Sequence, residues 1–192
     1  MKKLRSERLT LRRWEESDAD FVFDMYSRWE VQRFIGGAAA PRVMESRSEA
    51  EDRINIWRAM DHPVHGSWAI EEQHSGRLIG TLLLKFIPAS GLAIPLQPSS
   101  DTEIGWHLHP DAWANGYASE AASAVLEYAF DAGLGRVIAD TEPANAASQK
   151  VCTRIDMTHE GLTSAYYNET CELFVSAKNR TGSSGRSCAD NF

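Results

Sequence analysis

The stretch "HPDAWANGYASEAASAVLEYAF", residues 109–130, joins a run of small residues to an apolar helical pattern. Five small or turn-forming residues gather where the helix is expected to begin: Ala114, Asn115, Gly116, Ala118 and Ser119. A plain helix cap needs only one polar residue. Because a strand is predicted just before the loop, the loop amides and the positive end of the helix dipole should point at one place. That place suits a pyrophosphate, although small residues used only for packing would explain the stretch equally well.

The length and composition of the chain indicate a single domain. The chain has 192 residues, of which 43% are hydrophobic, which is enough for one well-buried core and short for two. We therefore predict one domain over residues 1–178. From Asn179 the text "NRTGSSGRSCADNF" is rich in Gly and Ser and has no apolar period. It predicts a disordered tail over residues 179–192.

Charge, cysteine usage and motif spacing argue against several classes of function. A net charge of -7 disfavours direct nucleic-acid binding and favours small or cationic partners. The three cysteines have no CxxC spacing, and His107 with His109 makes a poor ligand pair, so no metal is expected. No stretch approaches the length of a membrane span, so we expect a cytoplasmic protein without membrane contact. The loop at 109–119 lacks the glycine spacings of dinucleotide and nucleoside-triphosphate sites.

Strands and helices are predicted in alternation along the chain. The predicted strands are 8–14, 67–72, 78–87, 102–108, 136–141 and 171–177. The predicted helices are 17–26, 45–60, 118–132 and 145–155. Ser17 and Asp20 give the first helix an S-x-x-D capping signal. Residues 36–42 are expected to form a flexible connection, and the three prolines in 88–100 predict an irregular loop.

The segment from Glu103 through Gly161 resembles the GNAT superfamily of acetyl-CoA-dependent N-acetyltransferases, and most closely its Rim-type branch of ribosomal-protein N-terminal acetyltransferases. The opening "RLTLRRWEESDADFVFDMY", residues 8–26, is also typical of that branch. The resemblance implies an α/β (α+β) single domain. It further implies a central, mixed, mostly antiparallel twisted sheet of about six or seven strands, flanked by about four helices.

The resemblance also assigns a binding site for the co-substrate acetyl-CoA. The family's pyrophosphate signature, Gln/Arg-x-x-Gly-x-Gly/Ala, falls on residues 113–118, and Gly116 and Ala118 match it. Ala114 and Asn115 stand where a glycine and a basic residue are usual, which removes one cationic contact to phosphate. The residues expected to bind acetyl-CoA are Trp106, His107, Leu108, Trp113, Ala114, Asn115, Gly116, Tyr117, Ala118, Ser119, Asn145 and Ser148.

Two downstream stretches extend the resemblance. "NAAS", from Asn145 to Ser148, matches the N-x-x-S that begins the helix flanking the pantetheine arm. "RIDMTHEG" matches K-x-G-F-x-x-E-G, with Asp156 in place of the glycine and Met157 in place of the aromatic residue. Asp tolerates a left-handed backbone better than most residues, so a turn at Asp156 is expected to survive.

Acetyl transfer to an amine requires the amine to be neutral, so a general base is expected. Glu103 shares a strand face with Gly105 and His107 and is the predicted base; a salt-bridged strand-start carboxylate is the alternative. The resemblance implies that a backbone N–H near Leu108 stabilises the oxyanion. It also favours Ser148 as the donor to the departing thiolate. Cys152 occupies the position of the family's tyrosine and is expected to be a buried residue rather than a nucleophile.

Two functions of different class follow from these residues. The first is an N-acetyltransferase that passes the acetyl group to a primary amine, on a peptide N-terminus or a small molecule, by direct transfer in a ternary complex. The second is a non-catalytic acyl-CoA-binding or sensing module. The acceptor would enter between 36–42, 88–100 and 163–169, and the chain is expected to be a monomer or homodimer.

Overall fold

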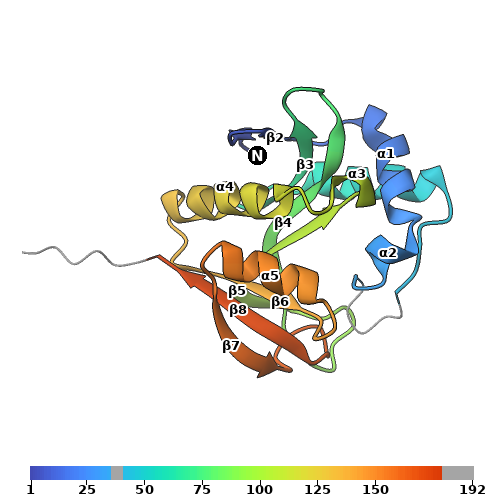
Figure 1. The fold of residues 1–192 in the computed structure, drawn as a ribbon. Helices are drawn as coiled ribbons and strands as arrows, with labels where there is room; N and C mark the ends of the chain where they lie inside the picture. The colour runs from blue at the N-terminus through green and yellow to red at the C-terminus, as the bar shows by residue number, and fades with distance from the viewer. Residues whose placement is uncertain (36–40, 179–192) are drawn as a thin grey trace, which may run out of the picture.

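The computed structural model describes residues 1–35 and 41–178, which form eight strands and five α-helices (Figure 1). The strands are β1 Leu4–Arg5, β2 Leu9–Arg12, β3 Gly66–Glu72, β4 Leu78–Pro88, β5 Pro98–Leu108, β6 Arg136–Thr141, β7 Thr158–Thr163 and β8 Cys171–Ala177. The α-helices are α1 Ala19–Tyr26, α2 Trp29–Gln32, α3 Arg47–Ala59, α4 Tyr117–Asp131 and α5 Ala146–Arg154. The predicted tail and most of the predicted 36–42 connection lie outside the described residues. Within the described ranges, no helix has both the length and the apolar character needed to span a bilayer.

The strands form one mixed sheet in the order β1-β2-β3-β4-β5-β6-β8-β7. Every neighbouring pair is antiparallel except β5 and β6, which are parallel. The predicted mostly antiparallel α/β fold is therefore confirmed, with β1, β7 and α2 as additional elements. β7 is an edge strand whose side chains are mostly exposed, so it lacks the apolar alternation that marks a half-buried strand.

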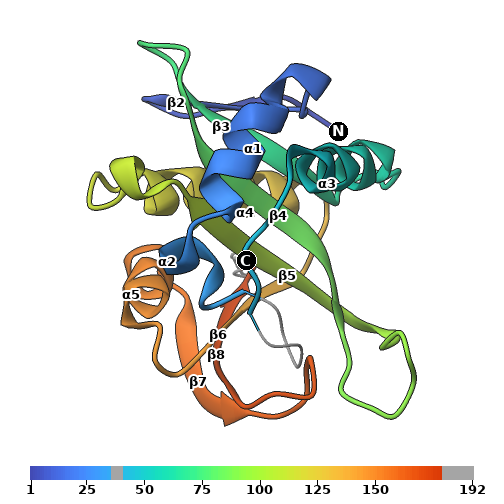
Figure 2. The same ribbon diagram turned by 90° about the vertical axis from the view of Figure 1, so that its right-hand side faces the viewer.

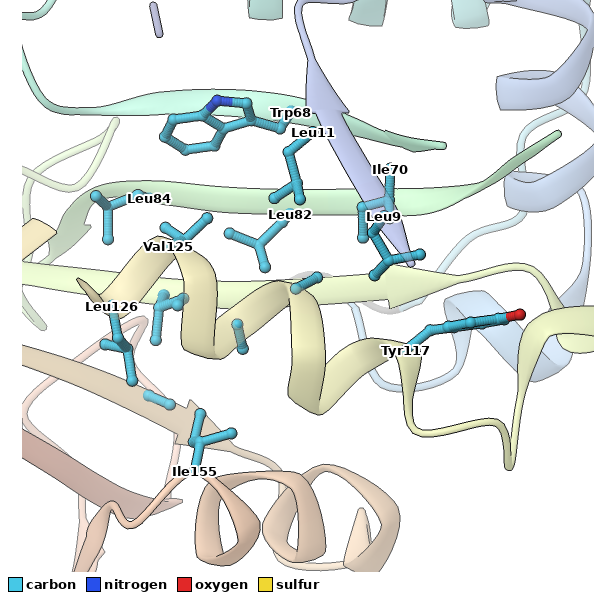
Figure 3. Packing of buried hydrophobic residues seen from close by; sticks show 14 of the residues in the cluster. Leu9, Leu11, Trp68, Ile70, Leu82, Leu84, Tyr117, Val125, Leu126 and Ile155 are labelled. Atoms are coloured by element: carbon cyan, nitrogen blue, oxygen red, sulfur yellow. The ribbon is translucent and has the colours of Figure 1, made fainter. Parts of the chain in front are cut away.

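Helices cover both faces of the sheet. In Figure 2, α1 and α3 lie in front of the strands and α4 lies behind them. Figure 3 shows the main core, in which apolar side chains of β2, β3 and β4 pack against α4. Buried residues of this core include Leu9, Trp68, Leu82 and Val125. A second core lies between α1, α3 and the other face of β3, and contains Trp14, Tyr26 and Ile54.

Two local predictions are wrong. The first helix does not begin on the Ser17–Asp20 signal: Glu15 and Asp18 form the capping box of a short 3-10 turn, and α1 starts at Ala19. The carboxylate of Asp18 also binds Arg12, which fixes the turn to β2. The loop expected over 88–100 is shorter, since Pro88 and Pro98 are paired across the hairpin and only the residues between them leave the sheet.

Candidate active site

The sheet opens between β5 and β6. Backbone pairing between them is confined to one position, Glu103 opposite Ile138, and residues that follow this position on both strands line a cavity. This cavity of about 1140 Å³ lies beside α4 and α5, and it is lined by side chains from both faces of the sheet. One wall of the cavity contains the start of α4 and the start of α5. The opposite wall contains Lys85, Glu103, Asp140 and Tyr167.

The loop before α4 presents backbone amides to this cavity. Ala114 and Gly116 both have left-handed φ, at 61° and 78°, and Gly116 is the N-cap of α4 without a side-chain cap. The first intrahelical bond runs from the amide of Glu120 to the carbonyl of Gly116, so the preceding helical amides have no acceptor in the helix. The hydroxyl of Ser119 is buried and has no hydrogen-bond partner.

A cluster of side chains beside the cavity holds the start of α4. Arg8 pairs with Glu120 through Nε at 2.7 Å and lies over the ring of Tyr117, with its guanidinium carbon 4.6 Å from the ring centroid. The Tyr117 hydroxyl donates to Glu72 at 2.5 Å. This hydrogen bond raises the pKa of the Tyr117 phenol, with burial as a smaller cause. The side chain of Tyr117 therefore fastens the start of α4 to Glu72 of β3 and to Arg8, which directly precedes β2.

The start of α5 forms the other rim. The side-chain oxygen of Asn145 accepts a bond of 3.2 Å from the amide of Ser148 and so caps the helix. Ser148 lines the cavity, one turn before Cys152. Cys152 is buried in the main core, and burial raises the pKa of its thiol to about 12. Of the two side chains weighed as donors to a thiolate, only Ser148 is in the cavity lining.

The end of β5 directs a backbone amide into the opening. The amide of His109 bonds to the carbonyl of Ile79 on β4, at 2.9 Å. Because successive strand amides point to opposite edges, the amide of Leu108 points away from β4 and towards the separated β6. The indole of Trp113 donates to the carbonyl of Leu108 at 2.9 Å, which ties the loop to the strand end.

Glu103 is held by two donors on the cavity wall opposite the starts of α4 and α5. The hydroxyl of Tyr167 donates to Glu103 Oε2 at 2.5 Å, and Lys85 Nζ lies 3.4 Å from the same oxygen. Lys85 also donates to the Tyr167 hydroxyl at 2.7 Å. Burial, followed by the charge of Glu103, raises the pKa of Tyr167, so its phenol stays protonated. The turn that carries Tyr167 has left-handed φ at Tyr167 and at Asn168, 55° and 58°.

A second carboxyl, that of Asp140, lies in the same wall of the cavity as Glu103. It is two residues beyond Ile138 on β6, and its Oδ2 is buried without a hydrogen-bond partner. Burial raises the pKa of Asp140 to about 7, and the charge of Glu103 adds to the rise. The thiol of Cys171 and the ammonium of Lys85 act against it. Asp140 therefore exchanges a proton near neutral pH.

His107 is on the same face of β5 as Glu103, but its ring nitrogen contacts Tyr26 of α1. Its Nδ1 lies 2.8 Å from the hydroxyl of Tyr26 of α1, which is buried, and the His107 side chain itself is half-buried. Burial, followed by the charge of Arg53, lowers the pKa of His107 to about 3, so the imidazole is neutral. A neutral ring with so low a pKa is a poor proton acceptor at neutral pH.

Comparison with known proteins identifies the family. The model of the acetyltransferase (GNAT) domain matches residues 8–158. This chain belongs to the GNAT acetyltransferase family. It is 33% identical over 165 residues to the uncharacterized N-acetyltransferase YoaA of Bacillus subtilis, covering 85% of this chain and 86% of YoaA.

Solved structures share the GNAT fold along most of the chain. The acetyltransferase of Agrobacterium tumefaciens has a TM-score of 0.71 at 25% identity and covers 93% of this chain and 95% of its own. RimL, a ribosomal L7/L12 alpha-N-protein acetyltransferase solved with coenzyme A, has a TM-score of 0.73 at 18% identity, covering 92% and 98%. Rim-type enzymes are thus among the structural neighbours, consistent with the branch that the sequence resembles.

Most residues expected from the sequence meet in the one cavity. Its lining contains Glu103, Trp106, His107, Leu108, Trp113, Ala114, Gly116, Tyr117, Ala118, Ser119, Asn145 and Ser148. Asn115 is outside that lining; it is exposed and its amide nitrogen donates to the carbonyl of Trp113. Asp156 has φ of 57°, so its expected left-handed turn is confirmed. Sequence reasoning missed Lys85 and Asp140, which line the cavity from β4 and β6, and Arg8, which holds the start of α4 from outside that lining.

Proposed function

We propose that this GNAT protein transfers the acetyl group of acetyl-CoA to a primary amine, on a peptide N-terminus or a small molecule, by direct transfer in a ternary complex. One observation carries the proposal: a single cavity joins an amide-lined loop on one face of the sheet to a pair of carboxyls on the other. An anionic donor and a cationic acceptor would thus approach the same opening from opposite sides.

The loop before α4 fits the pyrophosphate of coenzyme A. The first amides of α4 are unpaired within the helix, and Gly116, which has a left-handed backbone, carries no side chain that could block a phosphate. The unpartnered hydroxyl of Ser119 is an additional donor. Acetyl-CoA supplies the activated acyl group as a thioester. The amide of Leu108 is our candidate donor to the oxyanion, and Ser148 our candidate donor to the departing sulfur.

The opposite lining fits an ammonium ion. Glu103, the base predicted from the sequence, offers a carboxylate that Tyr167 and Lys85 hold in place. A lysine-type amine has a pKa of about 10.4 and an N-terminal amine about 8, so either would arrive largely protonated. It must lose a proton to a carboxyl before it attacks the thioester. Glu103 and Asp140 are the carboxyls available on this face of the opening.

The proposal is tested with the full chain, acetyl-CoA, and a panel of peptide N-termini, polyamines and small primary amines. Acetylated product is measured by mass spectrometry, and binding of coenzyme A by calorimetry. We expect turnover with at least one amine. Binding of coenzyme A without turnover across the panel would instead support the non-catalytic acyl-CoA-binding module. Absence of binding would overturn both.

The loop is tested by Gly116→Ala. The added Cβ would lie 3.6 Å from Arg8, an ordinary contact, but its left-handed φ of 78° is unfavourable for alanine. We expect weaker binding of coenzyme A with the fold retained. Alanine is preferred to valine here, because a β-branched residue at this φ strains the backbone further and confuses lost binding with lost folding.

A further inference from the structure

We propose that Asp140 is a catalytic residue that takes the proton from the acceptor ammonium, while Glu103 binds that ammonium. The inference rests on the proposed function and names the division of work between the two carboxyls of its acceptor side.

The two carboxyls face one open patch of the sheet. β5 and β6 run parallel with Glu103 opposite Ile138, so Asp140 is one side-chain repeat further along and level with Gly105. A Cβ built on Gly105 would meet only Glu103 Oε1, at 3.9 Å. The glycine therefore leaves free space beside Glu103, on the sheet face that also carries Asp140. Both carboxyls line the cavity around it.

Glu103 already has two partners on one of its oxygens. Its Oε2 accepts from Tyr167 and lies 3.4 Å from the ammonium of Lys85. Its Oε1 is the oxygen turned to the space above Gly105. A carboxylate held in this way can accept N–H bonds from an ammonium ion.

Asp140 is arranged to accept a proton. Its Oδ2 is buried without a hydrogen-bond partner, and only the thiol of Cys171 and the charge of Lys85 favour the charged form of the carboxyl. The groups that act on it from the packed elements are Lys85 of β4, Glu103 of β5, Cys171 of β8, Glu169 before β8, and Tyr167. Burial and the acidic members of this set bring the pKa of Asp140 to about 7, which suits proton exchange at neutral pH.

The reaction balances as follows. The ammonium N–H bond breaks, the proton passes to the Asp140 carboxylate, and the electron pair stays on nitrogen. That pair forms the new N–C bond at the thioester carbonyl, and the C–S bond breaks with its pair on sulfur. Ser148 gives its hydroxyl proton to the departing sulfur, and the second nitrogen proton replaces it on Ser148. Asp140 then releases its proton to solvent, so one proton is set free for each acetyl group transferred.

The test is the pH dependence of kcat/KM for the full chain, with an alkyl amine whose own pKa is about 10. We expect the wild-type value to rise through an inflection near pH 7. Asp140→Asn should lose that inflection and lower kcat/KM at neutral pH by about 10² to 10⁴-fold. The loss should shrink as the pH rises, because a larger fraction of the amine is then already neutral. Coenzyme A affinity should not change.

Two further variants separate the roles. Glu103→Gln should raise the KM for the amine and keep the inflection. Asp140→Glu restores a carboxyl at a displaced position and should restore the inflection at a reduced rate. If Asp140→Asn keeps the inflection and Glu103→Gln removes it, Glu103 is the base and the inference is overturned. Failure of the wild type to acetylate any amine would overturn the proposed function itself, which is a different result.

Discussion

Tyr167 donates a hydrogen bond of 2.5 Å from its hydroxyl to Glu103 Oε2, and this contact joins the turn before β8 to the middle of the sheet. The phenol stays protonated because burial raises its pKa, so the bond persists across the physiological pH range. It fixes the direction of a carboxylate that would otherwise be free to turn in the cavity. The neighbouring Tyr166 makes a similar bond of 2.7 Å to Asp101, away from the cavity lining.

Tyr167→Phe is expected to lower both stability and turnover. A hydrogen bond to a charged acceptor contributes about 1.5–3 kcal/mol, and that amount should be lost from the free energy of unfolding measured in urea. The same loss of positioning should lower kcat/KM by about 10 to 100-fold. Tyr166→Phe is the matched control, with a similar loss of stability and nearly full turnover. Equal activities for the two variants would contradict the assignment.

Asp140 makes the stability of the protein depend on pH. Its pKa is raised from 3.8 to about 7 on folding, chiefly by burial. Between these values the folded protein binds more protons than the unfolded chain, so the free energy of unfolding falls as pH rises. Allowing for partial exposure, the fall is about 2–4 kcal/mol.

Asp140→Asn should remove this fall in the free energy of unfolding. The difference in unfolding free energy, variant minus wild type, should grow from pH 4 to pH 7 and be flat above pH 8, because other titrating groups cancel between the two proteins. Urea unfolding at a series of pH values measures it. A difference that does not vary with pH would show that Asp140 is not buried in this way.

Gly105 leaves room for the acceptor amine in the part of the cavity lined by Glu103 and Asp140. Its virtual Cβ meets only Glu103 Oε1 at an ordinary distance, and the glycine has no left-handed φ, so Gly105→Ala should fold well. Alanine in a strand is favoured over glycine by about 0.5–1 kcal/mol. We expect equal or higher stability together with a higher KM for the amine. Unchanged KM for both small and bulky amines would place the acceptor elsewhere.

Ala114 carries a left-handed backbone, with φ of 61°. Ala114→Gly should relieve that strain and raise the free energy of unfolding by up to about 1 kcal/mol. Ala124→Gly, within α4, is the matched control and should lower it by about 1 kcal/mol, since its backbone is helical. Thermal unfolding of both variants gives the comparison. Destabilisation of equal size at the two positions would argue against the left-handed conformation.

The sequence predicted the features that depend on neighbouring residues, namely the two faces of β5 and the loop before α4. The alternation of Ile104 and Leu108 against Glu103 and His107 predicted both faces of β5, because one face packs on α4. The small residues before α4 predicted the loop for a similar reason, since backbone geometry at Gly116 depends on the residue itself. In contrast, β7 is an exposed edge strand, and its pairing with β8 leaves little periodicity to detect.

The remaining site residues depend on contacts across the sheet. Asp140 is one acidic residue within "RVIADT", and only the neighbouring strands bury it and place Glu103 nearby. Lys85 meets Glu103 because β4 pairs with β5. Arg8 reaches the start of α4 from β2 and its preceding turn, more than 100 positions earlier in the chain. No pattern within one segment carries that information.

The loop before α4 lacks a cation of its own, which gives a final prediction. Asn115 is exposed beside the amides of the loop, and the nearby guanidinium of Arg8 is paired with Glu120. Asn115→Lys adds a charge at a partly solvated position, where such an interaction contributes about 0.3–1 kcal/mol, so coenzyme A should bind about 2 to 5-fold more tightly.

Calorimetry at low and high salt checks this gain, which should fade as salt screens the charge. Asn115→Gln is the control, because it keeps a neutral amide and should leave affinity unchanged at both salt concentrations. Dephospho-coenzyme A separates the two phosphate sources: a gain that persists with it belongs to the pyrophosphate. A gain that disappears with it belongs to the ribose phosphate, and the pyrophosphate would then lie away from position 115. No gain with either ligand at low salt would contradict binding of the phosphates at this loop.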